Sequence, residues 1–175
     1  MKTPLQAHEF VLELLDRNER LLCALPAGAY ETPVEALGGA VGGHMRHSLE
    51  HLRILLHGRL TGEVYFERRN RDAGISTRLD AGLAELRSLR TELQAAAQEP
   101  GFLGAPLNAR TSLSGALDES VAYSSCVGRE LVYVGLHFVH HMALIEAALR
   151  LQNVPVEAHF GKAPATLAYE RGQAR

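Results

Sequence analysis

Four segments of this chain place apolar residues at three- and four-residue spacing, and this period constrains the fold more than any other feature of the sequence. The period is typical of α-helices that bury one face. The first apolar stripe runs from Phe10 to Leu25 and stops before Pro26, where a helix cannot readily continue. Together the four segments predict helices over residues 4–25, 41–57, 76–98 and 119–152.

The start of the first helix and the strand content can also be judged from the sequence. Thr3, Pro4 and Gln6 form the pattern of a helix N-terminus, with a capping hydroxyl, a proline where no NH is needed and a glutamine for a capping box. Alternation of apolar and polar residues, which is typical of strands, is confined to short pieces within 60–66 and 102–113. Strand is therefore expected to be at most a minor share of the structure.

These helices and the chain length favour one all-α domain. A chain of 175 residues is long enough for one well-formed hydrophobic core. Four long helices, joined by linkers that are long enough to cross over, are typical of a four-helix bundle, although the pattern leaves their up-down order open. We therefore expect a single domain over residues 1–175, with the tail 153–175 packing back on the bundle.

The charge, the lack of long apolar runs and the cysteine content argue against several kinds of partner and cellular location. The formal net charge is −2, and no segment gathers enough lysine and arginine for a phosphate-binding surface, so nucleic acid is not expected as a partner. No run of about 18 uncharged apolar residues and no signal peptide is recognisable, which argues against a membrane span and against export. Cys23 and Cys126 belong to no disulfide or zinc-binding pattern, so a reducing cytoplasm fits.

The histidines carry the main functional signal. Seven of the nine fall in two short windows, one in the second predicted helix and one in the fourth: His44, His47, His51 and His57, and then His137, His140 and His141. Residues four apart lie one turn above each other on a helix, so His137 and His141 present two imidazoles on one face, as do His47 and His51. Two imidazoles at this spacing can bind the same metal ion.

Any single histidine here is best explained as a residue at the edge of the core that is hydrogen-bonded to a backbone carbonyl. A histidine pair together with histidines on a second helix favours a metal site instead, because burying several imidazoles costs desolvation free energy that a divalent cation offsets. Zn²⁺ and Ni²⁺ bind neutral imidazole well. The sequence therefore predicts one divalent metal ion, zinc or nickel, between the two helices.

Three stretches also resemble a known family. Residues 41–52 (VGGHMRHSLEHL) resemble the second helix of the DinB-like (DinB/YfiT) family, and residues 125–131 (SCVGREL) followed by HFVHH at 137–141 resemble its last helix. The tail at 160–167 (FGKAPATL) resembles an uncharacterised bacterial branch of that family. The resemblance covers most of the chain, and it implies a four-helix bundle that holds a divalent ion with open coordination positions.

The resemblance also implies the ligand set. The family places one histidine on helix 2 and a His-x-x-x-His pair on helix 4, which correspond here to His47, His137 and His141. His44, His51 and His140 are then residues that surround the site or serve as alternative ligands. His44 and His51 lie within about one turn of His47, so the family alignment alone selects His47.

Two further residues of the fourth helix are candidates with two explanations each. Glu130 lies seven residues before His137 on nearly the same helical face, so it either orients an imidazole or moves a proton, or it forms an ion pair with Arg129 or another helix. Tyr133, one turn before His137, is either an aromatic wall of the pocket or a packing residue. The sequence leaves these alternatives open.

Two hypotheses about function follow. Three protein ligands leave a coordination position for water or substrate, as in catalytic metal sites. DinB-like relatives include thiol-dependent S-transferases and isomerases, so the resemblance implies a metal-dependent enzyme that acts on a small-molecule substrate, such as a low-molecular-weight thiol, with hydrolysis as the other option. The alternative is a non-catalytic metal-binding bundle, such as a homodimeric stress-response module, in which the ion ties two helices together.

Overall fold

The computed structural model describes residues 6–68, 70, 72–114 and 119–173. Its helices and strands follow the chain in this order: α1 (Ala7–Cys23), η1 (Glu35–Leu37), α2 (Val41–Thr61), β1 (Glu63–Tyr65), α3 (Ala73–Thr77), α4 (Leu79–Ala96), η2 (Phe102–Gly104), β2 (Pro106–Ser112), β3 (Ser120–Cys126), α5 (Val127–Leu151) and α6 (Pro164–Gln173).

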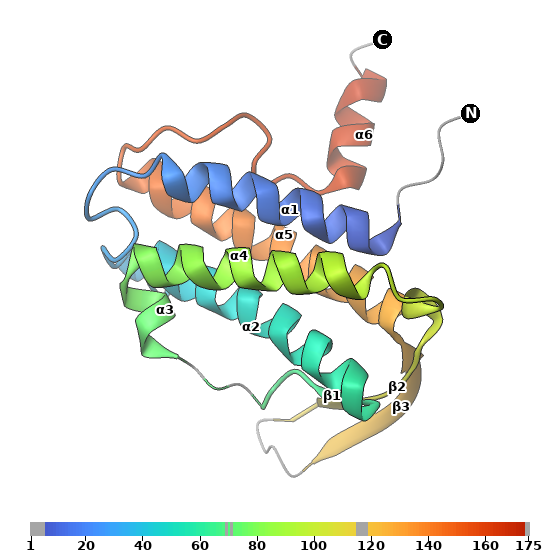
Figure 1. Ribbon diagram of the computed structural model, residues 1–175. Coiled ribbons are helices and arrows are strands. Elements are labelled where there is room, and N and C mark those ends of the chain that lie inside the picture. The colour runs from blue at the N-terminus through green and yellow to red at the C-terminus, as the bar shows by residue number, and fades with distance from the viewer. Residues whose placement is uncertain (1–5, 69, 71, 115–118, 174–175) are drawn as a thin grey trace.

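Four long helices enclose the core. Helix α2 packs against α5 and α4, and α1 packs against the same two helices, so each of the four contacts two neighbours (Figure 1). Leucines of the predicted stripes, such as Leu15, Leu52, Leu86 and Leu93, are at most slightly exposed and belong to one contiguous apolar cluster. The apolar period therefore identified the faces that pack together.

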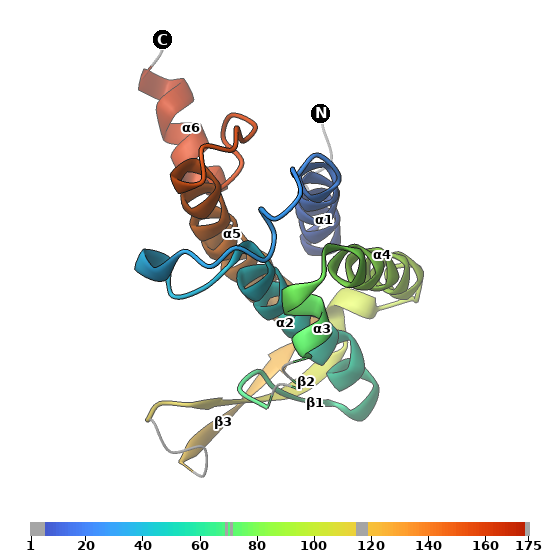
Figure 2. The same ribbon diagram turned by 90° about the vertical axis from the view of Figure 1, so that its left-hand side faces the viewer.

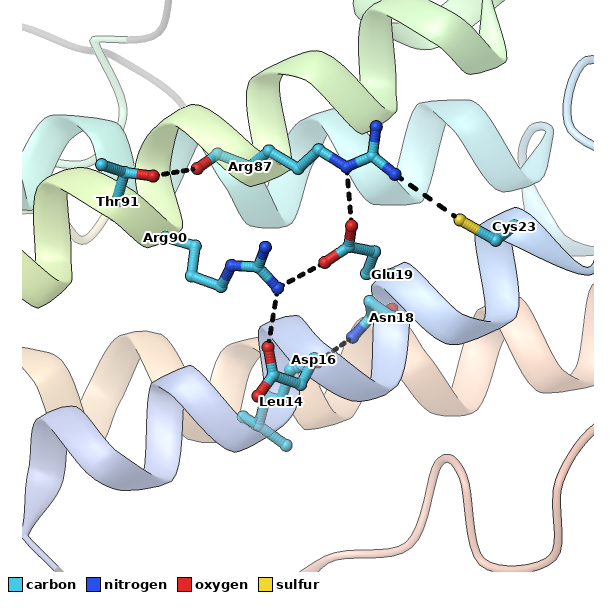
Figure 3. A network of polar contacts seen from close by, with 8 residues as sticks. All are labelled: Leu14, Asp16, Asn18, Glu19, Cys23, Arg87, Arg90 and Thr91. Atoms are coloured by element: carbon cyan, nitrogen blue, oxygen red, sulfur yellow. Dashed lines mark hydrogen bonds and ion pairs between the residues drawn. The ribbon is translucent and has the colours of Figure 1, made fainter.

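Polar side chains also join α1 to α4 along their solvent-facing edge. Arg87 Nε donates a 2.6 Å hydrogen bond to Glu19 Oε1, and Arg90 Nη1 contacts both Glu19 Oε2 and, at 2.9 Å, Asp16 Oδ1 (Figure 3). The hydrogen bond from Arg87 is the main cause that lowers the pKa of the Glu19 carboxyl. Arg87 also reaches the thiol of Cys23, at 3.8 Å.

A three-stranded sheet makes the all-α prediction wrong. Strand β1 pairs in parallel with β2, and β2 pairs antiparallel with β3, in the order β1-β2-β3. The sheet lies at one end of the long helices (Figures 1 and 2). The chain is thus a mixed α/β fold rather than an all-α four-helix bundle. The short alternating pieces at 60–66 and 102–113 contain β1 and the whole of β2, whereas β3 had no such signal.

The fourth predicted helix, over residues 119–152, begins too early because its first residues belong to the sheet. Residues 120–126 form β3, which pairs over its whole length with β2, and α5 begins only at Val127. Three of the seven residues of β3 are serines, and their poor helix propensity lets the long-range pairing with β2 determine the conformation. Cys126, with extended backbone angles, is the residue at which strand changes to helix.

The other helix boundaries differ by a few residues. Gln6 is the N-cap of α1 and forms a capping box with Glu9, so the helix begins at Ala7, while the predicted N-cap Thr3 lies outside the described residues. Helix α2 continues past its predicted end at residue 57 as far as Thr61. Gly62, whose φ is 79°, terminates the helix. Gly58 instead allows close approach, because a Cβ there would lie 2.4 Å from the carbonyl oxygen of Glu63.

The C-terminal tail has two parts. Phe160 is buried, and the backbone NH of Gly161 donates a 3.0 Å hydrogen bond to Glu146 Oε2 on α5. Helix α6, by contrast, has no buried residue and projects from the other helices (Figure 2).

Helix α5 is also long and apolar enough to cross a membrane by length and composition alone. Half of the window that meets this criterion is buried inside the structure, and the core helix of a folded protein passes the same test.

Candidate metal centre

The sheet places the two histidine-bearing helices side by side. Strand β1 follows α2 and strand β3 precedes α5, so the C-terminal end of α2 and the N-terminal end of α5 meet at the sheet and the two helices run antiparallel (Figure 1). His47 lies 14 residues before Thr61, the last residue of α2, and His141 lies 14 residues after Val127, the first of α5. At about 1.5 Å per residue, the two histidines therefore stand at the same height above the sheet.

The structure brings together the three histidines predicted as ligands. One potential ligand nitrogen from each of His47, His137 and His141 lies within 4.8 Å of the other two. The Nε2 atoms of His47 and His137 are 2.9 Å apart. One of these two nitrogens must carry the proton of this hydrogen bond, and a metal ion would displace that proton.

The spacing fits a divalent ion after side-chain rotation. Imidazole nitrogens bind zinc at about 2.0–2.1 Å, so two of them on one tetrahedral ion are roughly 3.4 Å apart. The separation of up to 4.8 Å therefore requires the rings to move closer by up to roughly 1.4 Å, which rotations of the side chains supply. The donor set consists of three imidazoles, which suits zinc, nickel and other borderline ions.

The three other candidate histidines surround this cluster. The Nδ1 of His51 donates to the backbone carbonyl of His47 at 2.9 Å, which determines its tautomer because a carbonyl can only accept. His44 Nδ1 lies 3.2 Å from His141 Nδ1. His140 is exposed, and its ring centre is 5.0 Å from that of His141.

Burial keeps His141 neutral. Desolvation, reinforced by the neighbouring imidazole of His137, lowers the pKa of His141 to about 3. Desolvation also lowers the pKa of His44. His141 therefore stays in the neutral form that binds metal ions throughout the physiological pH range.

Aromatic rings line one side of the cluster. Tyr133 stacks on His137 with ring centres 5.9 Å apart, and Phe66 stacks on His51 at 5.3 Å. Tyr133 and Phe66 are also in contact, with centres 5.1 Å apart. Tyr133 thus packs against the histidine rings, but it is not among the residues that line the cavity described below. Phe66 lies in the segment after β1, where no helical pattern pointed to it.

Glu130 makes the ion pair that was one of its two explanations. Its Oε1 accepts hydrogen bonds from Arg129 Nη1 at 2.8 Å and from Ser125 Oγ at 2.5 Å. The carboxylate is fully buried, and its Oε2 has no hydrogen-bond partner among the described residues. Its charge is one of the causes that raise the pKa of Tyr133, of which burial is the largest. Glu130 is not one of the residues in the histidine cluster.

A cavity of about 300 Å³ opens beside the cluster. Its walls are residues 38–40, Gly43, Arg46 and the histidines His44, His47 and His141. Sequence reasoning identified these histidines but neither Arg46 nor the glycines as part of the site, since a cavity depends on how the segment before α2 folds back.

Comparison with known proteins adds little. No protein family model matches the chain, and no solved structure matches it significantly. The chain is similar to FK506-binding protein 5 of Rhizopus delemar, with 29% identity over 103 residues. The match covers 59% of this chain and 27% of that protein, so the chain corresponds to about a quarter of the relative's length. Similarity at this level does not assign a family.

Proposed function

We propose that this chain is a divalent-metal protein related to the DinB-like family, and that it acts as a metal-dependent enzyme on a small molecule. The observation that carries the proposal is the convergence of His47, His137 and His141, from two helices, within 4.8 Å. Two of the three stretches that resemble the family supply these three histidines. The family relation therefore rests on the site and its motifs, not on the fold class.

Zinc or nickel is the proposed ion, because the three ligands are imidazoles and no carboxylate belongs to the cluster. Bound there, the ion would act as a Lewis acid toward a thiol or a water molecule. The protein's own groups hold the site in shape. His51 is held by the carbonyl of His47, and Tyr133 and Phe66 pack against the rings of His137 and His51.

A low-molecular-weight thiol is the proposed substrate class, and the proposed reaction is attack of its thiolate on an electrophile, in which the thiol loses its proton and its sulfur forms the new bond, with hydrolysis as the other option. Binding of FK506, to which the relative's name refers, is not part of the proposal, since the match covers only 27% of that protein.

The first test is metal content. Purified protein should hold about one zinc or nickel ion per chain by elemental analysis, and His137→Ala and His141→Ala should each lose it. His57→Ala and His159→Ala are matched controls, because both histidines are exposed and outside the cluster. Full metal retention in both of the α5 variants would refute the proposed site.

The second test separates the enzyme from a structural metal protein. The 2.9 Å contact between His47 and His137 joins α2 to α5, so an ion there would also tie the two helices together. Turnover of a panel of thiols and electrophiles by the metal-loaded protein, abolished by a chelator, supports the enzyme. Tight metal binding with thermal stabilisation and no turnover of thiols, esters or amides supports the non-catalytic alternative.

A further inference from the structure

The cavity beside the histidine cluster has features of a binding site in its own right. It has a volume of about 300 Å³, which is at the small end of the range for ligand pockets. Both helices of the proposed metal site contribute to its wall, with His47 from α2 and His141 from α5. A molecule in the cavity would therefore be next to an ion held by these histidines.

Residues 38–40, which also line the cavity, belong to a tight backbone turn. An antiparallel bridge between Val34 and Gly39 closes the turn that contains η1, and Gly38 has a φ of 72°, which a residue with a side chain rarely adopts. A Cβ added at Gly39 or Gly43 would meet no atom within 4 Å. The space beside these two glycines is therefore open to a ligand, and not filled by other parts of the described chain.

The charge of the cavity has one sign. Among the described residues that line it, Arg46 is the one with a permanent charge, and none is a carboxylate. The partner of Arg46 within the described residues is Glu50, whose Oε2 is 3.8 Å from Arg46 Nε. Glu50 is buried and lines a different cavity farther along α2. A divalent ion on three neutral imidazoles would add two further positive charges.

We propose that this cavity is the substrate subsite of the metal centre, and that it binds a small molecule carrying a carboxylate. The guanidinium of Arg46 binds the carboxylate, and a thiol or other donor of the same molecule faces His47 and His141. A planar guanidinium matches a carboxylate geometrically, and one arginine in a small cavity suits one monoanionic group. The inference rests on the proposed metal-dependent function and specifies its substrate class.

The test compares two small thiols on the full-length chain loaded with Co²⁺. The probes are 3-mercaptopropionate and 2-mercaptoethanol, which are similar in size and differ in the carboxylate. Binding is followed by the sulfur-to-cobalt charge-transfer absorption at one pH. We expect 3-mercaptopropionate to bind roughly 10-fold more tightly, as one charge-assisted contact implies.

Variants assign this preference to the cavity. Arg46→Gln should abolish the preference and leave the affinity for 2-mercaptoethanol unchanged. Because this change leaves Glu50 buried without its partner, the double variant Arg46→Gln with Glu50→Gln is measured in parallel. Arg53→Gln is the matched control, since Arg53 lies on the same face of α2 and does not line the cavity.

Filling the cavity provides an independent test. Gly43→Phe should weaken the binding of both thiols, whereas Gly172→Phe, at another helical glycine with open space beside it, should change neither. If Co²⁺ binds but the two thiols bind equally, the inference is wrong and the metal site stands. The same holds if the preference survives in both Arg46→Gln and the double variant Arg46→Gln with Glu50→Gln. If no Co²⁺ binds, the proposed function fails and this inference fails with it.

Discussion

The three histidines of α2 near the site differ in what their side chains contact. His47 lies within the cluster with both α5 histidines, His51 is bonded to the carbonyl of His47, and His44 contacts His141. An imidazole that binds the ion contributes directly to affinity, whereas one that orients a ligand contributes less. The roles of the three residues can therefore be ranked by measurement.

We expect His47→Ala to weaken metal binding by well over 100-fold, and His44→Ala and His51→Ala to weaken it by about 10- to 100-fold or less. The three variants should be compared by competition with a chelator at one pH, because protons compete for the same nitrogens. Should His44→Ala or His51→Ala be the most damaging, the ligand on α2 is one turn away from the position proposed.

The buried imidazole of His141 should make the metal-free protein sensitive to acid. Its pKa of about 3 in the folded state lies below the ordinary value of 6.5, so between these pH values the unfolded chain binds a proton that the folded chain does not. Stability should therefore be full above about pH 6.5 and fall as the pH decreases, by roughly 1 kcal/mol per pH unit.

Urea unfolding at pH 7.5, 6.5 and 5.5 in the presence of a chelator measures this slope. His141→Gln removes the titrating group, so its stability should depend less on pH than that of the original protein. Equal slopes for the two proteins would show that His141 is not the cause.

The candidate ligands were predictable from the sequence, because helical spacing places His137 and His141 on one face without any knowledge of the rest of the fold. Selecting His47 over His44 and His51 needed the resemblance to a family, since all three lie within a broad arc of α2. Arg46 and Phe66 could not have been predicted, because their positions depend on how the segments before and after α2 fold back against it.

At the scale of the elements, two adjacent glycines at the start of α2 have opposite surroundings. A Cβ at Gly42 would lie 2.2 Å from the carbonyl oxygen of Ser76 and 2.6 Å from the ring of Tyr30. A Cβ at Gly43 would meet nothing within 4 Å. Gly42 therefore allows α3 and the segment before α2 to approach the helix closely, and Gly43 does not have this role.

Gly42→Ala should lower the free energy of unfolding by about 1–3 kcal/mol, because the backbone of α3 must shift to make room. Gly43→Ala should raise it by up to about 1 kcal/mol, since alanine is the better helix former and fits without strain. Urea unfolding of the two variants checks both signs in one experiment. A loss of stability in Gly43→Ala as large as that in Gly42→Ala would contradict the packing described.

Strand β3 is an element that could not be predicted from the sequence. Residues 120–126 contain no clear alternation of apolar and polar residues, and they directly precede a strongly apolar helical pattern. The sequence pattern therefore predicts helix over these residues as well. Their conformation depends on seven paired positions in β2, which is a contact between segments and not a property of either one. The long helices were predictable because their period is local.

At the scale of the whole molecule, a bound ion would join α2 and α5, which already pack against each other. Binding to the folded state alone stabilises a protein by about 2.7 kcal/mol when the free ion is at 100 times its dissociation constant.

For a protein of this size, such a stabilisation should raise the melting temperature by roughly 5–10 °C. Thermal unfolding with zinc or nickel, compared with unfolding in a chelator, measures the shift. His137→Ala should show no shift, and His57→Ala should show the full one. A shift of the same size in His137→Ala would place the stabilising ion elsewhere on the chain.

The sheet that connects the end of α2 to the start of α5 has a consequence for metal coordination. Because β1, β2 and β3 are hydrogen-bonded side by side, the two halves of the ligand set are held in register before any ion arrives. The chain is then a preorganised multidentate chelator, which loses little further freedom on binding. Discrimination among divalent ions would follow from ionic radius and preferred geometry, because an ion whose nitrogen spacing lies beyond the reach of side-chain rotation must distort both helices and the sheet to which they are anchored.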